Sequence, residues 1–291
     1  MSLKDVSTDR IKNVDHVLQE ILKKPGGDFS EDHIHDVRTS IRRLQSTYKM
    51  LPRRAREQKN LYKYMDACNG LFRVLNDIRD YDVMLSRLSE YPESDATKKV
   101  KSFVTKKRTN LLGRASKRVL AIEDAKSKKL RVVGVSETQL DKRFKIRLEK
   151  QAKKVRDDLL VVWTGKAKKS QVHKLRKDCK KLRYTLELEE KKYEKQMQIL
   201  KEWQGYLGTI HDVEMFQGVL RRKNNDRGAL DHVIKAEESK GTESYATFMN
   251  KSRNEETRAV IDTLFVGTPK PEVSPRRAMK VPSKTGEGRP S

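Results

Sequence analysis

The chain carries the same basic amphipathic segment twice, and this repeat restricts its fold more than any other feature. The first copy reads HDVRTSIRRL from His35 to Leu44, and the second reads HKLRKDCKKL from His173 to Leu182. At about 100° per residue, the apolar positions of each copy fall on one face of an α-helix. Such a face is stable only when it is buried against other helices. The repeat therefore predicts two equivalent helices in a helical domain.

A second stripe on each of these helices is polar and contains no acidic residue. It holds His35, Arg38, Arg42, Ser46, Lys49 and Arg53 in the first copy, and Lys169, His173, Arg176, Lys180 and Tyr184 in the second. Ordinary surface helices mix both signs of charge. Because a stripe of one sign repels itself, we expect an anion to lie along it. The first stripe extends about 27 Å at 1.5 Å per residue, which favours an extended polyanion over a single phosphate ester.

Sparse proline and glycine indicate long helices that are broken at few points. We expect helices at about 5–24, 30–51, 57–90, 94–125, 138–164, 168–189, 191–222 and 226–264, with Ser30 as the N-cap of the first basic helix. Residues 127–136 are the longest interruption and the expected link between two halves. No convincing strand is present, although 131–135 could form a short extended piece.

A second motif extends the repeat beyond the basic helix. The segment LNDIRD, which ends at Asp80, aligns with LGTIHD, which ends at Asp212. Each half therefore has the same order of helices, which predicts an all-α protein of two similar helical bundles that form a two-fold internal repeat. We expect the halves at 1–130 and 131–266. A proline-containing basic tail at 267–291 is expected to be disordered. A pseudo-two-fold axis would bring both basic stripes to one central surface.

The positive charge belongs to the helical body. The formal net charge is +25, of which six basic and two acidic residues in the tail account for only +4, leaving +21. A field of this sign attracts nucleic acid, inorganic polyphosphate or an anionic membrane surface. The N-terminus lacks an apolar signal region, and no apolar run approaches the ~18 residues that span a bilayer. We therefore expect a soluble cytoplasmic protein.

Several features that would indicate another chemistry have ordinary explanations. Cys68 and Cys179 occupy apparent core positions and form neither a disulfide framework nor a metal-type cluster. The triphosphate-tunnel signature Glu187-x-Glu189-x-Lys191 closes a helix here, whereas it normally lies on a strand. No phosphate-binding glycine loop, nucleophile elbow or zinc spacing occurs. The sequence thus predicts no catalytic residue, no metal site and no cofactor.

The repeated motifs resemble the CHAD family, the conserved histidine α-helical domain. Each half has its histidine, the arginine three residues later, and two basic residues before a leucine, followed by the helix that ends in aspartate. The resemblance covers about residues 5–265. It implies two four-helix bundles around a basic central channel that binds inorganic polyphosphate, and association with polyphosphate granules in some members. Gln45, Asn76 and His211 depart from the pattern, where the other half has Arg183, Gly208 and Arg79.

The candidate site residues follow from the stripes and the motifs. Polyphosphate-binding candidates are His35, Arg38, Arg42, Arg43, Lys49, Arg53, Lys169, His173, Arg176, Lys177, Lys180, Lys181, Arg183 and Tyr184, and supporting candidates are Arg79, Asp80, His211 and Asp212. Guanidinium groups grip phosphate through paired donors, and lysine supplies a mobile charge. The two motif histidines have two readings, as donors to phosphate or as half-buried groups bonded to a neighbouring helix.

The leading hypothesis is a non-enzymatic polyphosphate-binding protein whose channel is formed by both halves. The first alternative is nucleic-acid binding. The stripes disfavour it because they lack amides for base edges and offer few aromatic residues for base stacking, since only Tyr48 and Tyr184 lie near and Tyr48 faces the core. The second is a phosphatase or polyphosphate-processing enzyme, for which a nucleophile or metal constellation is missing. The third is a scaffold at an anionic membrane or granule surface, which is compatible with the leading hypothesis.

Overall fold

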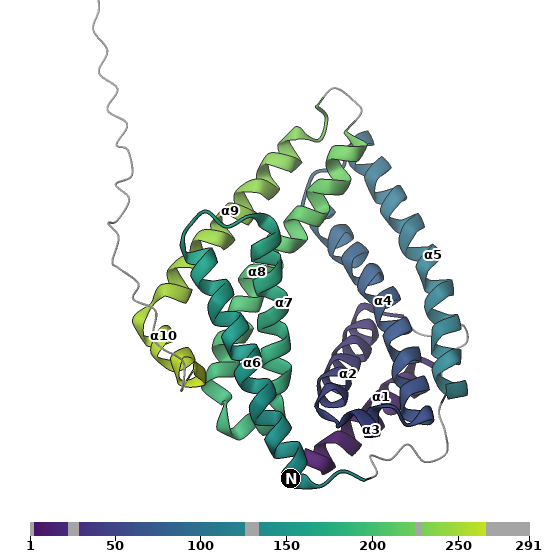
Figure 1. The fold of residues 1–291 in the computed structure, drawn as a ribbon. Helices are drawn as coiled ribbons and strands as arrows, with labels where there is room; N and C mark the ends of the chain where they lie inside the picture. The colour runs from purple at the N-terminus through teal and green to yellow at the C-terminus, as the bar shows by residue number, and fades with distance from the viewer. Residues whose placement is uncertain (1–2, 23–28, 126–133, 225–227, 266–291) are drawn as a thin grey trace, which may run out of the picture.

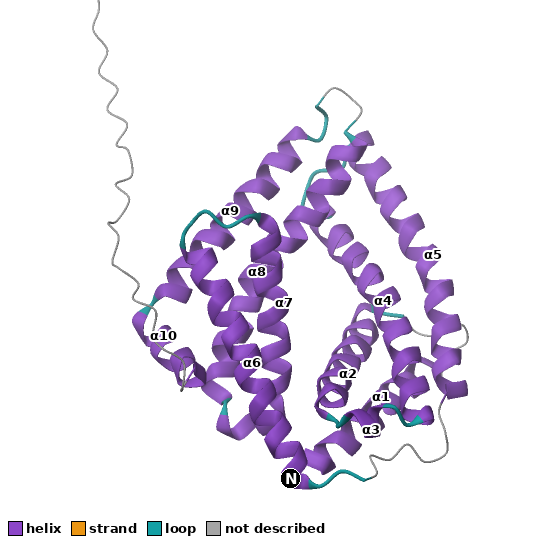
Figure 2. Cartoon of the chain, viewed as in Figure 1, coloured by secondary structure: helices purple, strands orange, loops and turns teal. Residues whose placement is uncertain are grey.

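Long helices form the described chain, as the sparse proline and glycine predict. The structure is a computed structural model and describes residues 3–22, 29–125, 134–224 and 228–265, among which no strand occurs (Figure 2). The first half contains α1 (Leu3–Leu22), α2 (Glu31–Met50), α3 (Arg53–Arg56), α4 (Lys59–Leu88) and α5 (Asp95–Ala125). The second contains α6 (Glu137–Trp163), α7 (Lys169–Leu186), α8 (Glu194–Lys223), α9 (Asp231–Arg253) and α10 (Glu255–Asp262), with 3₁₀ turns at Glu187–Lys192 and Thr263–Phe265. The all-α prediction is confirmed.

Helix ends follow local capping signals. The Ser30 hydroxyl accepts a hydrogen bond from the backbone N–H of His33 at 3.4 Å, so the predicted N-cap of α2 is confirmed. The prediction of a single helix over 226–264 is wrong, because the helix is interrupted at Asn254. The Asn254 side chain accepts from the N–H of Thr257 at 3.2 Å and starts α10. The helix expected over 168–189 ends earlier, and Glu189 has non-helical dihedral angles.

Three of the sequence predictions concern residues outside the described ranges. Residues 127–133 of the expected link between the halves lie there. Residues 131–133 of the possible extended piece lie there, while Gly134 adopts a φ of 73° and Val135 is buried. The predicted tail, 267–291, also lies outside the described residues.

The two halves pack their helices in the same order. In the first half α1 packs on α2, α2 on α4, and α4 on α5, and in the second α6 packs on α7, α7 on α8, and α8 on α9 (Figure 1). Short α3 and α10 are additions to this pattern. The equal order agrees with the internal repeat, while the pseudo-two-fold relation and the exact domain bounds stay predictions.

The apolar face of each basic helix is buried, as the repeat requires. Ile34, Val37, Ile41 and Leu44 of α2, and Val172, Leu175, Cys179 and Leu182 of α7, have relative exposures of 8% or less. They belong to one hydrophobic cluster that runs through both halves. Cys68 lies in it too, and burial raises the pKa of the Cys68 thiol to about 12, so this thiol stays protonated. Both cysteines are buried free thiols.

A second hydrophobic cluster joins the halves at another place. Met84 and Leu88, at the end of α4, and Val104 of α5 pack with Phe216 of α8 and Val233 of α9. Towards their C-terminal ends, α2 and α7 contact each other, and the Ser46 and Thr185 hydroxyls lie 3.3 Å apart there. The halves are therefore connected at two places, with α2, α4, α7 and α8 facing one another between them.

Candidate anion-binding site

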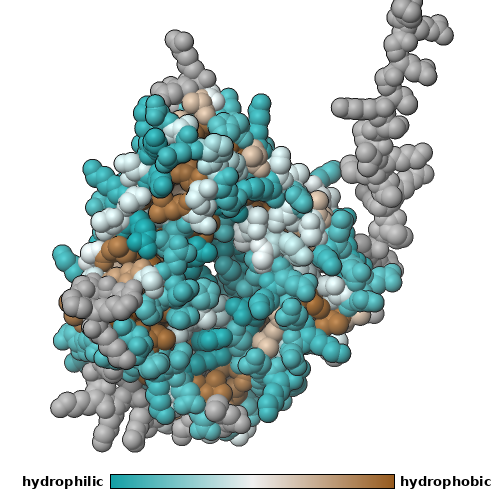
Figure 3. Space-filling view, turned by 180° about the vertical axis from the view of Figure 1, so that it is seen from behind, coloured by the Kyte–Doolittle hydropathy of each residue, from teal (hydrophilic) through white to brown (hydrophobic). Residues whose placement is uncertain are grey.

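A pocket lies between α2 and α4 of the first half and α6, α7 and α8 of the second. Its volume is about 560 Å³. The basic side chains that line it are Arg38, Arg42, Lys49, Arg79, Arg147, Arg176, Lys177, Lys180 and Lys181. Figure 3 shows a hollow near the centre of one face of the molecule, surrounded mainly by hydrophilic residues. The apolar face of each basic helix points into its own half, so the polar stripe turns towards the other half.

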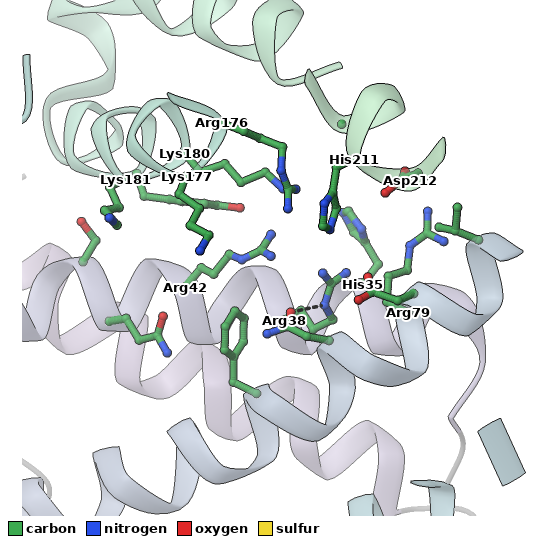
Figure 4. A pocket seen from close by; sticks show the side chains of 18 of the residues that line it. His35, Arg38, Arg42, Arg79, Arg176, Lys177, Lys180, Lys181, His211 and Asp212 are labelled. Atoms are coloured by element: carbon green, nitrogen blue, oxygen red, sulfur yellow. Dashed lines mark hydrogen bonds between the residues drawn. The ribbon is translucent and has the colours of Figure 1, made fainter. Parts of the chain in front are cut away.

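Most of the predicted site residues meet in this pocket. The structure brings together His35, Arg38, Arg42, Lys49, Arg79, Asp80, Arg176, Lys177, Lys180, Lys181, Tyr184, His211 and Asp212 (Figure 4). They come from four helices that the sequence separates by up to 177 residues, the interval from His35 to Asp212. Arg43, Arg53, Lys169, His173 and Arg183 lie outside the pocket lining.

Arg43 and Arg183 lie outside the pocket because both bind one carboxylate. The Nε of Arg43 donates to Glu187 at 2.9 Å, and the Nη1 of Arg183 donates to the other oxygen at 2.6 Å. The side chain of Glu187 is only 9% exposed. Burial lowers the pKa of Arg43, and the bond to Glu187 more than reverses this, so its pKa is raised overall. These two arginines therefore join α2 to the end of α7.

The other three lie near the ends of the stripes. Arg53 begins α3, is exposed, and pairs with Glu57 at 2.6 Å. Lys169 is the exposed first residue of α7 and lies close enough to Glu214 to oppose the effect of burial on the pKa of that carboxyl. His173 is half-buried against His211, with 4.9 Å between the ring centroids. It therefore packs against His211, which lines the pocket, without lining the pocket itself.

Several lining residues were not among the predicted site residues. Arg147 comes from α6, where its place beside the buried Phe144 and Leu148 carries no signal specific to an anion site. Phe72 of α4 lies under the guanidinium of Arg42, 5.2 Å from Cζ to the ring centroid. Gln45, Ser46, Asn76, Val83 and Gly208 complete the lining. Of these, Gln45, Asn76 and Gly208 are positions at which the motifs of the two halves differ, and Ser46 belongs to the polar stripe of α2.

Asn76 and Gly208, which occupy equivalent positions of the two halves, give Arg38 and Arg176 different surroundings. The Nε of Arg38 donates to the Asn76 side chain at 3.1 Å. Arg176 is the repeat equivalent of Arg38, but Gly208 stands where its partner would be. Within the described part of the chain, the Nε of Arg176 is buried and has no hydrogen-bond partner. An unmatched buried donor is costly, so an acceptor from a ligand would stabilise it.

Burial of like charges lowers the pKa values of the pocket bases. Burial, followed by Arg176, Arg42 and Arg38, lowers the pKa of Lys180 to about 7. Burial, followed by Arg42, lowers the pKa of Arg38 to about 10. His211 has a pKa of about 3 because of burial and the neighbouring Arg176 and His173, so it is neutral at pH 7. These surroundings disfavour the positive charge of the pocket bases, and a bound anion would favour it.

The acidic residues of the lining lie together at one end. Burial raises the pKa of Asp80, against the opposing effect of Arg38, and burial raises that of Asp212, against Arg87 and Arg176. Figure 4 shows Asp212 beside Arg79 at this end, while Lys177, Lys180, Lys181 and Arg42 gather towards the other. The pocket therefore has a balanced end and a strongly positive end.

Two further features bear on the classes of function. Among the described residues, no group of three or more His, Cys, Asp or Glu side chains is arranged to hold a metal ion. Within the same ranges, no helix combines the length and the apolar composition that a membrane crossing requires.

Comparison with known proteins identifies the family. The model of the CHAD domain matches residues 13–221. A solved structure, the crystal structure of the CHAD domain from the plant Ricinus communis, superposes with a TM-score of 0.52 at 16% sequence identity, covering 88% of this chain and 91% of that chain. A search of curated proteins finds no match. The resemblance of the motifs is thus confirmed, and the structural likeness supports the same all-α fold.

Proposed function

The chain belongs to the CHAD domain family, and we propose that it binds inorganic polyphosphate in the pocket between α2, α4, α7 and α8. One observation carries the proposal. Nine arginine and lysine side chains from both halves line one pocket of about 560 Å³, and burial, followed by the nearby arginines, lowers the pKa of Lys180 there to about 7. Such an arrangement is unfavourable without a partner, and a chain of phosphates supplies negative charge at every unit.

Both halves would hold the same anion. Arg38 and Arg42 come from the first half, and Arg176, Lys180 and Lys181 come from the second. Arginines donate paired hydrogen bonds to phosphate oxygens, and lysines add point charges. Release of condensed counterions adds a term that weakens steeply with salt. Because contacts from the second half form on a chain already held by the first, they benefit from a high effective concentration.

The pocket is better suited to phosphate than to bases. Recognition of nucleic acid uses free aromatic faces for stacking and free amides for base edges. Here Phe72 is covered by Arg42, and the Tyr184 ring lies 4.4 Å from Cζ of Arg183. The Gln45 amide donates to Asn69 at 2.8 Å, and Asn76 is engaged by Arg38. These groups are thus already occupied, which favours a ligand that offers only phosphate.

We further propose that the protein binds polyphosphate without hydrolysing it. Asp80 and Asp212 are the lining acids, and each lies among arginines that compete for its negative charge. Positive charge stabilises bound substrate and transition state alike, so by itself it produces affinity and not rate. The granule surface that the family resemblance implies is a further proposed partner, since it presents the same polymer.

A competition experiment tests the proposal. Labelled long-chain polyphosphate bound to the full chain is displaced by unlabelled polyphosphate, duplex DNA or RNA at equal phosphate concentration. We expect polyphosphate to compete best at moderate salt, and equal or better competition by nucleic acid would overturn the assignment. Arg42→Gln or Lys180→Gln should each reduce the affinity at least tenfold. Lys150→Gln, an exposed lysine of α6 outside the pocket lining, is the matched control and should have little effect.

A further inference from the structure

The positive end of the pocket continues into a second group of cations. Burial lowers the pKa of Lys49, and its charged neighbours are Arg147 and Lys181. Burial likewise lowers the pKa of Arg147, whose charged neighbours are Arg143 and Arg56. All of these neighbours are positive. Since Arg147 also lines the pocket, it connects the pocket to Arg56 of α3 and Arg143 of α6.

The two outer arginines are held in place by backbone contacts. The Tyr48 hydroxyl donates to the backbone carbonyl of Arg56 at 2.9 Å and fixes α3 against the end of α2. The Nε of Arg143 donates to the carbonyl of Met50, the last residue of α2. Within the described ranges, the Nε of Arg56 is buried and lacks a hydrogen-bond partner. The group therefore combines fixed positions, like charges and an unsatisfied donor.

The opposite end of the pocket is less suited to an emerging anion. Its acids, Asp80 and Asp212, repel phosphate. Two cavities adjoin it. One, of about 390 Å³ between α4, α5 and α8, shares Asp80 and adds Asp77. The other, of about 350 Å³, shares Asp212 and adds Glu31 and Glu90, so it is more acidic still. Lys107 and Arg114 also line the first of these cavities, so it provides a rival exit. Electrostatics favour the end at which no acid is found among the described lining residues.

We propose that a polyphosphate chain longer than the pocket leaves it at Lys49 and Arg147 and continues onto Arg143 and Arg56. The inference rests on the proposed function and gives it a direction. The segment in the pocket determines whether the anion binds, and the extension determines how strongly a longer chain is preferred. Arg56 gains the acceptor that it lacks, and the repulsion among the arginines is relieved.

Comparing the two exits tests this direction. Arg56→Gln with Arg143→Gln removes two charges from the proposed exit, and Lys107→Gln with Arg114→Gln removes two from the rival exit. Each double variant of the full chain is titrated with long-chain polyphosphate and with tripolyphosphate, a ligand short enough for the pocket alone. We expect the first pair to weaken binding of the long chain roughly ten- to a hundredfold, as for two lost hydrogen bonds of ordinary strength. Binding of tripolyphosphate should stay unchanged.

Salt dependence gives a second readout. The slope of log affinity against log salt for the long chain should fall by about 1.4, if each contact contributes ~0.7 as for single-stranded nucleic acids. Arg56→Gln alone leaves the bond between Arg143 and Met50 intact, so it should show about half of this change even if the double variant is destabilised. Circular dichroism and thermal melting verify the fold of each variant.

Three results would overturn the direction. The first is a greater loss of long-chain affinity in the Lys107 and Arg114 variant than in the Arg56 and Arg143 variant. The second is an equal loss of affinity for long-chain polyphosphate and tripolyphosphate in the Arg56 and Arg143 variant. The third is unchanged long-chain affinity in both variants. Absence of polyphosphate binding by the unaltered protein would instead overturn the proposed function itself, so the two failures are distinguishable.

Discussion

The pKa of Lys180 predicts that polyphosphate binding takes up protons near neutral pH. Burial and three neighbouring arginines hold this pKa at about 7 in the free protein, and Asp212 opposes them only weakly. An anion favours the charged ammonium, so binding raises the pKa. As pH rises through 7, free Lys180 loses its proton, and the proton must be restored before the charged contact forms. Affinity therefore falls with increasing pH.

The size of the effect follows from the titration of one group. With a free pKa of 7, about half of the lysine is charged at pH 7, about 9% at pH 8 and about 1% at pH 9. If the bound lysine remains charged, the affinity falls roughly fivefold from pH 7 to 8 and roughly fiftyfold from pH 7 to 9. Proton uptake rises from about half a proton at pH 7 to about nine-tenths at pH 8.

Isothermal titration calorimetry in buffers of different ionisation heats measures both quantities. Lys180→Arg should bind with little pH dependence over this range, because a guanidinium stays charged. Lys181→Arg, which changes a more exposed lysine of the same lining, should retain the dependence. His211 does not interfere, since its pKa of about 3 keeps it neutral throughout. A pH profile of the unaltered protein that is flat from 7 to 9 would refute the reasoning.

Four other substitutions should have separate effects. Gly208→Asn gives the buried Nε of Arg176 an acceptor within the protein, so calorimetry should show severalfold weaker polyphosphate binding. A Cβ at this position meets nothing within 4 Å, so thermal stability should not fall. Glu187→Gln leaves the two arginines that it binds without their carboxylate, which should lower the free energy of unfolding by about 1–3 kcal/mol; an unchanged melting temperature would contradict this. Asp80→Asn and Asp212→Asn should each strengthen polyphosphate binding, and phosphate-release assays with Mg²⁺ or Mn²⁺ should show no turnover by any form. Metal-dependent release that either variant abolishes would show that the protein is an enzyme.

The long helices were predictable because each repeats its apolar residues with one period over many turns. The shorter irregularities were not. The four-residue α3 is too short to show a period, and the break at Asn254 lies between segments that are both helical. The Asn254 side chain and the acidic residues after it do form a helix-start signal. That signal does not stand out in the sequence, because the apolar spacing allows one continuous helix through it.

The site was predictable as far as one helix face determines it. The polar stripes predicted that Arg38 and Arg176 lie on one surface, and both line the pocket. The stripes did not indicate which basic residues beside them would bind other groups of the protein instead. Arg43 turns to Glu187, which is 144 residues away in the chain. The involvement of Arg147 depends on how α6 crosses the end of α2, and no local pattern encodes that crossing. Tertiary contacts between distant segments therefore determined the remainder.

The two hydrophobic clusters that join the halves also set how the pocket meets its ligand. Because α2 contacts α7 and the second cluster joins α4 to α8, widening the pocket by a hinge would break packed contacts, which favours a surface that is formed before the ligand arrives. Capture then proceeds at a rate set by diffusion and by the attraction of the basic side chains. A polymer of identical units offers such a rigid surface many equivalent registers. If the protein binds polyphosphate as proposed, a captured chain would shift by one unit without dissociating, and the number of ways to bind would increase with chain length.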